Sequence, residues 1–270
     1  MPELPEVETV ARQLAPLVRG RTVVALRVLD PSLKHGRFPR IAGRHVTDVT
    51  RSGKRVLFAF SSGAGRNDGI WLAVHLRMTG RLIWADEARR SELAHLRARF
   101  RLDRGSLLFY DTRRFGTFQF YQSFEETEPE GVDPLSPGLN SRELGRMIGK
   151  SNQNIKAWLL RQDRLVGLGN IYASEILFVA GISPLREAAS LNVADHRSLL
   201  RATRCVLRRA IKNCGTTFSD FQDTQGLTGS YQNYLTVYGR EREPCPRCSA
   251  PVVRFVQQQR STYHCAQCQK

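Results

Sequence analysis

Four of the six cysteines fall within the last 26 residues, and their spacing constrains the fold more than any other feature of the sequence. Two Cys-x2-Cys pairs stand sixteen residues apart: Cys245, Cys248, Cys265 and Cys268. Four thiolates at this spacing are typical of a closed tetrahedral site for one structural Zn²⁺ ion, with redox cysteines or an iron–sulfur site as the alternatives. Residues 252–256 and 261–264 predict two strands of a hairpin. We expect a small module that folds on its metal.

The net charge of the chain is the strongest signal in its composition. The 270 residues carry a formal charge of +16, and 35 of the 41 basic residues are arginine. Guanidinium groups bind phosphate in bidentate fashion, and phosphate contacts release counterions, so this charge favours a nucleic acid partner. An arginine-rich composition would explain arginine over lysine, but it would not explain the excess of base over acid.

Neither a membrane span nor an export signal is expected. The longest apolar run, 70–76, is short and contains His75, and hydrophobic residues make up 41% of the chain, enough for folded cores. Glu3, Glu6 and Glu8 occupy the place where a signal peptide would be basic and then apolar. We expect a cytoplasmic protein, in which Cys205 and Cys214 are reduced.

The hydrophobic pattern divides the chain into a β-rich part and a helical part. Apolar residues at helical spacing predict an amphipathic helix over 5–20. Eight short β-like segments follow, and strands at this spacing favour a sandwich or a barrel. These segments are 22–29, 46–50, 56–60, 70–76, 81–84, 97–102, 107–110 and 117–121. An acidic stretch with three prolines, 124–137, is typical of a linker, and helices are predicted over 141–149, 154–161, 171–180 and 194–213.

The opening MPELPEVETV has two interpretations. Proline in the first turn and acids near a helix start are ordinary helix features. If Met1 is removed, however, Pro2 supplies a secondary amine whose pKa lies near 8, far below that of lysine. Such an amine can attack a sugar C1′ to give an iminium ion, with Glu3 as general acid and Glu6 holding the amine.

Two strand-end motifs are also open to two interpretations. DTRRFG, 111–116, and HLRMTG, 75–80, each set an aromatic or methionine side chain beside arginine in front of a turn. Phe115 is either a core residue or a wedge that stacks into a base step, and a lone methionine such as Met78 is more often a core residue.

Six motifs in this order resemble those of the formamidopyrimidine-DNA glycosylase family, whose bifunctional members remove oxidised bases. They are PELPEVETV at the start, HLRMTG, DTRRFG, GLGNIYASE at 167–175, VYGREREPC at 237–245, and the closing CxxC-x16-CAQCQK. The resemblance covers essentially the whole chain.

The resemblance implies roles for individual residues. Pro2 would be the Schiff-base nucleophile, Glu3 the acid that protonates sugar or base, and Glu6 their support. Lys54 matches the family lysine that contacts phosphate and serves in β-elimination, and Arg260 the zinc-finger arginine assigned to δ-elimination. Met78, Arg113 and Phe115 would fill the space of the everted nucleotide, with Arg113 facing the widowed cytosine. The remaining residues implied along the DNA path are His75, His95, Arg114, Lys150, Asn170 and Tyr172.

The implied fold class is α+β. It comprises an N-terminal helix with a two-sheet β-sandwich, a helix-two-turn-helix domain and a C-terminal β-hairpin zinc finger. The implied boundaries are 2–123 for the catalytic domain, 124–137 for the linker, 138–235 for the helical domain and 236–270 for the zinc finger. A monomer acting on double-stranded DNA with oxidised bases or abasic sites is expected, associated with the nucleoid when bound.

The expected function is excision of oxidised purines by base flipping, followed by β- and δ-elimination. A relative of the same fold that prefers oxidised pyrimidines is the alternative within the family. A non-catalytic damaged-DNA-binding protein is the alternative outside enzymes, but pure binding needs neither Pro2 nor Glu3. The segment 216–231, expected to cap the lesion, departs from the family pattern and leaves the lesion preference open.

Overall fold

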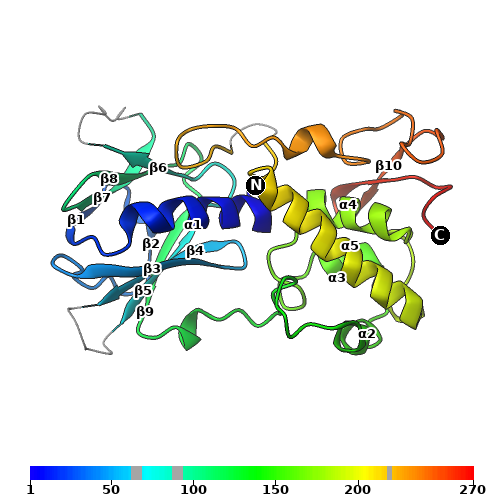
Figure 1. The fold of residues 1–270 in the computed structure, drawn as a ribbon, viewed down its shortest axis with the longest axis horizontal. Coiled ribbons are helices and arrows are strands. Elements are labelled where there is room, and N and C mark those ends of the chain that lie inside the picture. Colours follow the sequence, from blue (N-terminus) through cyan, green and yellow to red (C-terminus); the bar gives the residue numbers. More distant parts are fainter. Residues whose placement is uncertain (62–68, 87–93, 218–220) are drawn as a thin grey trace. The chain divides into compact units, whose positions relative to one another are not determined.

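The computed structural model describes residues 1–61, 69–86, 94–217 and 221–270 (Figure 1). These residues form two compact units. The first contains Met1–Glu128 together with Asn213–Gln232, and the second contains Pro129–Lys212 together with Asn233–Lys270. The segment 213–232 therefore groups with the N-terminal part of the chain, and the four domain ranges expected from the sequence stay predictions. Residues 218–220 of the expected capping segment lie outside the described residues.

Helix α1, Leu4–Val18, begins the first unit. Its apolar residues Val7, Val10, Leu14 and Val18 are buried, as the helical spacing predicts. Glu3 is the N-cap residue, and the chain leaves the helix at Gly20 with a positive φ of 76°. The buried face packs against strands β3 and β4, so the start of the chain is mounted on a sheet.

In the residues that the structure describes, nine strands follow α1 in the first unit, and all eight predicted segments are among them. They are β1 (Val23–Val28), β2 (Lys34–His35), β3 (His45–Ser52), β4 (Arg55–Ser61), β5 (Ile70–His75), β6 (Arg81–Ala85), β7 (Leu96–Leu102), β8 (Ser106–Tyr110) and β9 (Thr117–Tyr121). One sheet has the order β2-β9-β5-β4-β3 and the other β1-β7-β8-β6. Strand β2 was not predicted, because two exposed residues carry no alternation.

The two sheets pack face to face through aromatic side chains. The sequence left both a sandwich and a barrel open, and this packing identifies a sandwich. Phe58 of β4 stacks on Phe100 of β7 at 6.1 Å between ring centroids. Phe118 of β9 meets Phe100 at 5.8 Å and Phe109 of β8 at 5.0 Å. Apolar residues of α1 join the same core cluster. The helix and both sheets therefore share one hydrophobic core.

The second unit contains helices α2 (Ser141–Ile148), α3 (Ile155–Leu159), α4 (Asn170–Ala180) and α5 (Val193–Lys212). Helix α4 packs against α3, α5 and the hairpin strand β11, and α2 packs against α5. Helix α3 is shorter than the predicted 154–161. The side-chain amide of Gln162 binds the carbonyls of Leu160 and Leu168 and the N–H of Gly167, which closes the glycine-rich turn directly after the helix.

Strands β10 (Val253–Gln257) and β11 (Arg260–His264) form the predicted C-terminal hairpin. The two turn residues, Gln258 and Gln259, both have positive φ, 48° and 58°. Phe178 of α4 packs in one buried cluster with two of the cysteines, so the hairpin module rests on α4. No helix in the described part of the chain is long and apolar enough to cross a membrane.

Candidate functional site

The carboxylate of Glu6 holds the first turn of α1 in place. Its Oε2 accepts a hydrogen bond from the Glu3 N–H at 2.7 Å, and its Oε1 accepts one from the Thr216 N–H at 2.7 Å. Pro2, Glu3 and Glu6 are all buried. A capping contact that starts the helix thus also ties the N-terminal turn to the segment 213–232.

A second acid of α1 fixes the helix to the turn that carries Lys54. Glu8 Oε2 accepts from Arg51 Nε at 2.8 Å, and Arg51 Nη1 donates to the Gly53 carbonyl at 3.1 Å. Burial alone would raise the pKa of the Glu8 carboxyl, but the charge and hydrogen bond of Arg51, with help from Arg12, bring it below its usual value. Lys54, the residue after Gly53, is 8% exposed.

His75 is held in its neutral form at the end of β5. Its Nδ1 accepts a hydrogen bond from the Arg77 N–H at 3.0 Å. Burial, and then the charges of Arg77, Lys54 and Arg55, lower the pKa of His75 to about 3. Because Nδ1 is an acceptor, Nε2 carries the proton and is available as a donor. Lys54 and His75 therefore lie near the same end of this sheet.

Met78, Arg113 and Phe115, called the wedge residues below, gather on the surface. Met78 is 40% exposed and Phe115 is 50% exposed, so the interpretation of either as a core residue is wrong. Arg113 Nη1 lies 3.1 Å from Met78 Sδ, and its guanidinium carbon lies 4.8 Å from the centroid of the Phe115 ring. Apolar side chains exposed in this way beside a cation suit insertion into a base stack.

Arg114 anchors the turn at residues 111–116 by binding Asp30. Its Nε and Nη2 bind Asp30 at 2.6 and 3.0 Å, and its φ is 59°. The hydrogen bond from Arg114, against the opposing effect of burial, holds the pKa of Asp30 well below its usual range.

His95 is exposed, with a φ of 62°, and its carbonyl accepts the Asp111 N–H at 2.9 Å. Contact of either Arg114 or His95 with DNA stays a prediction.

In the second unit, two side chains hold the backbone next to Arg260. Asn170, at the start of α4, donates from Nδ2 to the Ser261 carbonyl at 2.8 Å. Lys156 is fully buried, and its Nζ donates to the same carbonyl at 3.0 Å and to Thr262 Oγ1 at 2.7 Å. Arg260 itself is exposed at the start of β11. These contacts fix the backbone of the residue that follows Arg260.

Two further predicted DNA-binding residues lie in the second unit. Lys150 is exposed two residues after the end of α2. Tyr172 is in the first turn of α4, and its side chain is fully buried. The proposed DNA contacts of both residues stay predictions.

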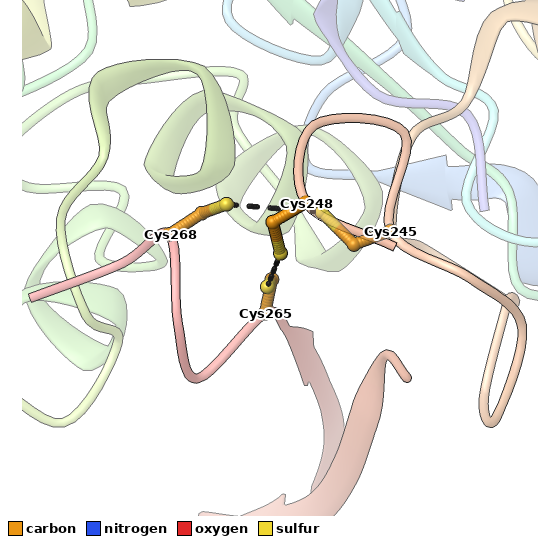
Figure 2. A group of neighbouring side chains, drawn as sticks. All are labelled: Cys245, Cys248, Cys265 and Cys268. Atoms are coloured by element: carbon orange, nitrogen blue, oxygen red, sulfur yellow. Dashed lines mark hydrogen bonds between the residues drawn. The ribbon is translucent and has the colours of Figure 1, made fainter. Parts of the chain in front are cut away.

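The four C-terminal cysteines converge on one point, as Figure 2 shows. All four sulfurs lie within 4.8 Å of one another, with Cys245 and Cys268 at 3.9 Å and Cys248 and Cys265 at 3.4 Å. Zinc–sulfur bonds of about 2.3 Å in a tetrahedron set neighbouring sulfurs roughly 3.8 Å apart. The donor set and its spacing fit one Zn²⁺ ion with no open coordination position, as predicted.

Several residues that shape the site had no role assigned from the sequence. Asp30 and Arg51 act through partners 84 and 43 positions away, and Lys156 through partners 105 and 106 positions away. No local pattern reports such pairs. Asp111 is the first residue of the DTRRFG motif. An aspartate can accept the N–H two residues ahead in an Asx turn, and this spacing to Arg113 was the signal from which its structural role could have been predicted.

Comparison with known proteins agrees with this geometry. Three family models match the chain. Residues 1–118 match the formamidopyrimidine-DNA glycosylase N-terminal domain, and residues 131–222 match the H2TH domain of the same family. Residues 242–270 match the zinc finger found in FPG and IleRS. Formamidopyrimidine-DNA glycosylase of Chloroflexus aurantiacus is 40% identical over 279 residues, covering 100% of this chain and 98% of that protein. The chain belongs to the formamidopyrimidine-DNA glycosylase family. The predicted family, fold class and enzyme class, a bifunctional DNA glycosylase and lyase of base-excision repair, are thereby confirmed.

Solved structures of the family superpose along the whole chain. MutM (Fpg) from Thermus thermophilus has a TM-score of 0.87 and 39% identity, covering 99% of this chain and 98% of that one. Lactococcus lactis Fpg bound to DNA containing an abasic site has a TM-score of 0.87 and 30% identity, covering 99% of each chain. The Lactococcus protein has also been solved with DNA containing Fapy-dG, as a mutant, and with DNA containing an oxidised pyrimidine.

Proposed function

We propose that this protein excises oxidised purines from double-stranded DNA, 8-oxoguanine opposite cytosine and formamidopyrimidines, and then cleaves the strand at the abasic site. The names of its relatives and the DNA complexes of the Lactococcus protein support the substrate class. The observation that carries the proposed chemistry is the start of α1, where Pro2 and Glu3 are adjacent and Glu6 holds the backbone of the turn.

In the first step, the amine of Pro2, freed by removal of Met1, attacks C1′ of the flipped nucleotide. The C1′–N bond to the base breaks as the N–C1′ bond forms, and the base leaves with a proton from Glu3. The amine then loses its proton as the C1′–O4′ bond breaks and O4′ gains a proton, which opens the sugar ring. The resulting iminium ion is an electron sink. Because Glu6 accepts from the Glu3 N–H, the nucleophile and the acid are held in a fixed relation.

The iminium ion then drives two eliminations. Loss of a proton from C2′ expels the 3′ phosphate, and loss of a proton from C4′ then expels the 5′ phosphate. Hydrolysis of the remaining Schiff base frees Pro2 and the unsaturated sugar fragment, leaving a one-nucleotide gap with phosphates at both ends. Lys54, next to neutral His75, is proposed to act at phosphate and in β-elimination, and Arg260 at phosphate and in δ-elimination. The donors of these two cationic side chains would stabilise the departing phosphate oxyanions.

The wedge residues support the choice of a purine lesion. A base must leave the stack before the N-terminal amine can reach C1′, and insertion of Met78 and Phe115 offsets part of the lost stacking. Arg113 carries only donors, which match the acceptors on the pairing edge of a cytosine. A cytosine left without its partner implies that the flipped base was a purine.

Zinc would be held by the four cysteines as a structural ion that closes the base of the hairpin. When bound, it supplies folding free energy and no open coordination position for chemistry. Arg260 extends from the same hairpin, and Lys156 and Asn170 hold the adjacent backbone.

Oxidised pyrimidines are the second candidate substrate, because the Lactococcus protein has been solved with DNA containing one. A binding protein without catalysis is disfavoured, because binding requires neither an N-terminal proline nor the adjacent carboxylic acid.

Borohydride trapping tests the chemistry. With an 8-oxoguanine:cytosine duplex, we expect a covalent complex whose cross-linked peptide is attached through Pro2. Pro5→Ala, which changes a proline three residues further along the chain, inside α1, is the matched control and should trap like the native chain. Absence of a trapped complex with correctly trimmed protein would refute the enzymatic proposal.

A nicking panel tests the lesion preference. Duplexes with 8-oxoguanine, a formamidopyrimidine or an oxidised pyrimidine, each opposite all four bases, are compared under single-turnover conditions. We expect 8-oxoguanine and formamidopyrimidine opposite cytosine to be processed fastest. Faster processing of the pyrimidine lesion would favour the second candidate.

A further inference from the structure

A buried carboxylate joins the two turns that carry the wedge residues. Asp111 directly follows β8 and is 0% exposed. Its Oδ1 accepts hydrogen bonds from the Thr79 hydroxyl and from the Arg113 N–H, the latter at 3.2 Å. Its Oδ2 accepts the Gly116 N–H at 2.7 Å. One side chain therefore contacts the neighbour of Met78 in one turn and the residues on both sides of the Arg114–Phe115 pair in the other.

The hydroxyl of Thr79 extends this connection. Its Oγ1 accepts the Arg113 N–H at 3.1 Å while its own proton goes to Asp111. Thr79 is 5% exposed, so the hydroxyl is shielded from water that could replace these bonds. The backbone of Arg113 is thus bound both by the first turn and by the carboxylate between the turns.

The same two turns are packed on one aromatic ring. A Cβ added to Gly80 would lie 2.9 Å from Phe109 Cζ, and one added to Gly116 would lie 2.5 Å from the same atom. The absence of a side chain at both glycines lets each turn approach the ring closely. Packing and hydrogen bonding therefore fix the two turns relative to each other.

The chemistry of the carboxylate suits this task. Burying an ionised group is costly unless donors replace its water. In the described part of the chain, the groups that donate hydrogen bonds to the Asp111 carboxylate are neutral: one hydroxyl and two backbone N–H groups. A carboxylate accepts at both oxygens, whereas the amide of asparagine would direct an N–H₂ toward one of these donors.

We propose that Asp111 is a positioning residue for the opening of the duplex. Through Thr79, it holds Met78, Arg113 and Phe115 as one preorganised group, so the three side chains enter the base stack together. This inference rests on the proposed function. Because Asp111 is fully buried, its side chain presents no surface to DNA, so we assign its effect to the extrusion of a paired base and not to the steps that follow.

The test compares two substrates in single-turnover experiments. The first is a duplex with 8-oxoguanine paired to cytosine, and the second is a duplex with a preformed abasic site, which has no base to extrude. We expect Asp111→Asn to slow base excision about tenfold or more, because small misplacements of positioned groups have effects of this size. Cleavage of the abasic duplex should change by less than about threefold.

Matched variants separate positioning from folding. Thr79→Val removes the hydroxyl at nearly constant volume and should slow base excision selectively, whereas Thr79→Ser keeps the hydroxyl and should restore it. Asp103→Asn changes an exposed aspartate of the same unit, which accepts one backbone N–H, and should leave both rates unchanged. Should Asp111→Asn fail to fold, the Val and Ser variants at Thr79 decide the question.

A second readout follows the wedge directly. In a Phe115→Trp background, stacking of the indole on bases quenches its fluorescence, and Asp111→Asn should slow the quenching phase with the paired lesion. Equal losses on both substrates, or no loss with Asp111→Asn or with Thr79→Val, would overturn the inference. Failure of the native chain to trap or to nick either substrate would instead refute the proposed function.

Discussion

Glu6 illustrates how one side chain of this protein combines a local and a distant task. Its carboxylate accepts the Glu3 N–H three residues back and the Thr216 N–H 210 residues ahead. Each bond replaces a water contact of a buried polar group, and together they immobilise the backbone that carries Pro2. The amine of Pro2, the proposed nucleophile, would thereby be held in a rigid turn.

A residue retained ahead of Pro2 should abolish the chemistry without unfolding the protein. The extension converts the secondary amine into an amide nitrogen that cannot form an iminium ion, so base excision and trapping should fall by at least about a hundredfold. The free energy of unfolding should change by less than about 0.5 kcal/mol. The control is the same protein after proteolytic removal of the extension to expose Pro2. Activity of the extended form would exclude Pro2 as the nucleophile.

His75 should stay neutral throughout the physiological range. Since its pKa in the folded state is about 3 and its unfolded value is about 6.5, the folded state binds fewer protons in between. Its contribution to stability is complete above about pH 6.5 and is lost as the pH falls toward 3. NMR titration should show no protonation between about pH 5 and 8. Arg77→Gln should raise the pKa, and an unchanged value would argue against the role of that charge.

At the scale of elements, the hairpin of β10 and β11 depends on groups outside its two strands. Its buried apolar neighbours are few, and two of the residues in that cluster are the metal-ligating Cys245 and Cys265. A module with so small a core has little hydrophobic stabilisation of its own. We therefore expect its stability to follow metal binding closely.

Removal of zinc should release the hairpin and with it most of the affinity for DNA. Cys245→Ser, or treatment with a chelator, should lower affinity for a lesion-containing duplex by about a hundredfold or more, since the fold of the finger depends on the metal. Fluorescence anisotropy and zinc analysis provide the measurement. Cys205→Ser, which changes a cysteine of α5 outside the metal cluster, is the control. Normal binding by the zinc-free protein would mean that the finger takes no part in gripping DNA.

The turn of this hairpin is strained in a way that can be relieved. Gln259 has a φ of 58°, a conformation that costs residues other than glycine roughly 1–2 kcal/mol. Gln259→Gly should stabilise the hairpin by up to about 1 kcal/mol, seen as tighter zinc binding in competition with a chelator. Gln257→Gly, in the extended strand next to the turn, should weaken it. Equal effects of the two changes would contradict the explanation by strain.

At the scale of the molecule, the charge of +16 makes DNA affinity depend steeply on salt. A plot of log K against log salt should be linear with a strongly negative slope, and Arg260→Gln should make it shallower by about one unit. Arg27→Gln, in β1 and outside the proposed contacts, should leave the slope unchanged. A native slope near zero would contradict a binding mode built on phosphate contacts.

Most of the secondary structure was predictable because its causes are local. Alternation marked the eight longer strands, and helical spacing marked α1, α2, α4 and α5 within a few residues. The two departures have tertiary causes: β2 exists only through its pairing with β9, and α3 ends where Gln162 binds the backbone of the next turn. The sandwich was one of two options until the aromatic contacts between the sheets decided it.

The sequence by itself determined the metal module and the family, and it named the residues proposed to carry the chemistry, because spacing and residue type are properties of the chain alone. Tertiary structure decided what holds those groups in place. Asp111 meets Thr79 from 32 residues away, Arg114 meets Asp30 from 84, and Lys156 meets Ser261 from 105. Such contacts depend on burial and on directions that exist only after packing, and they determine whether the exposed side chains proposed to meet DNA are rigid or loose.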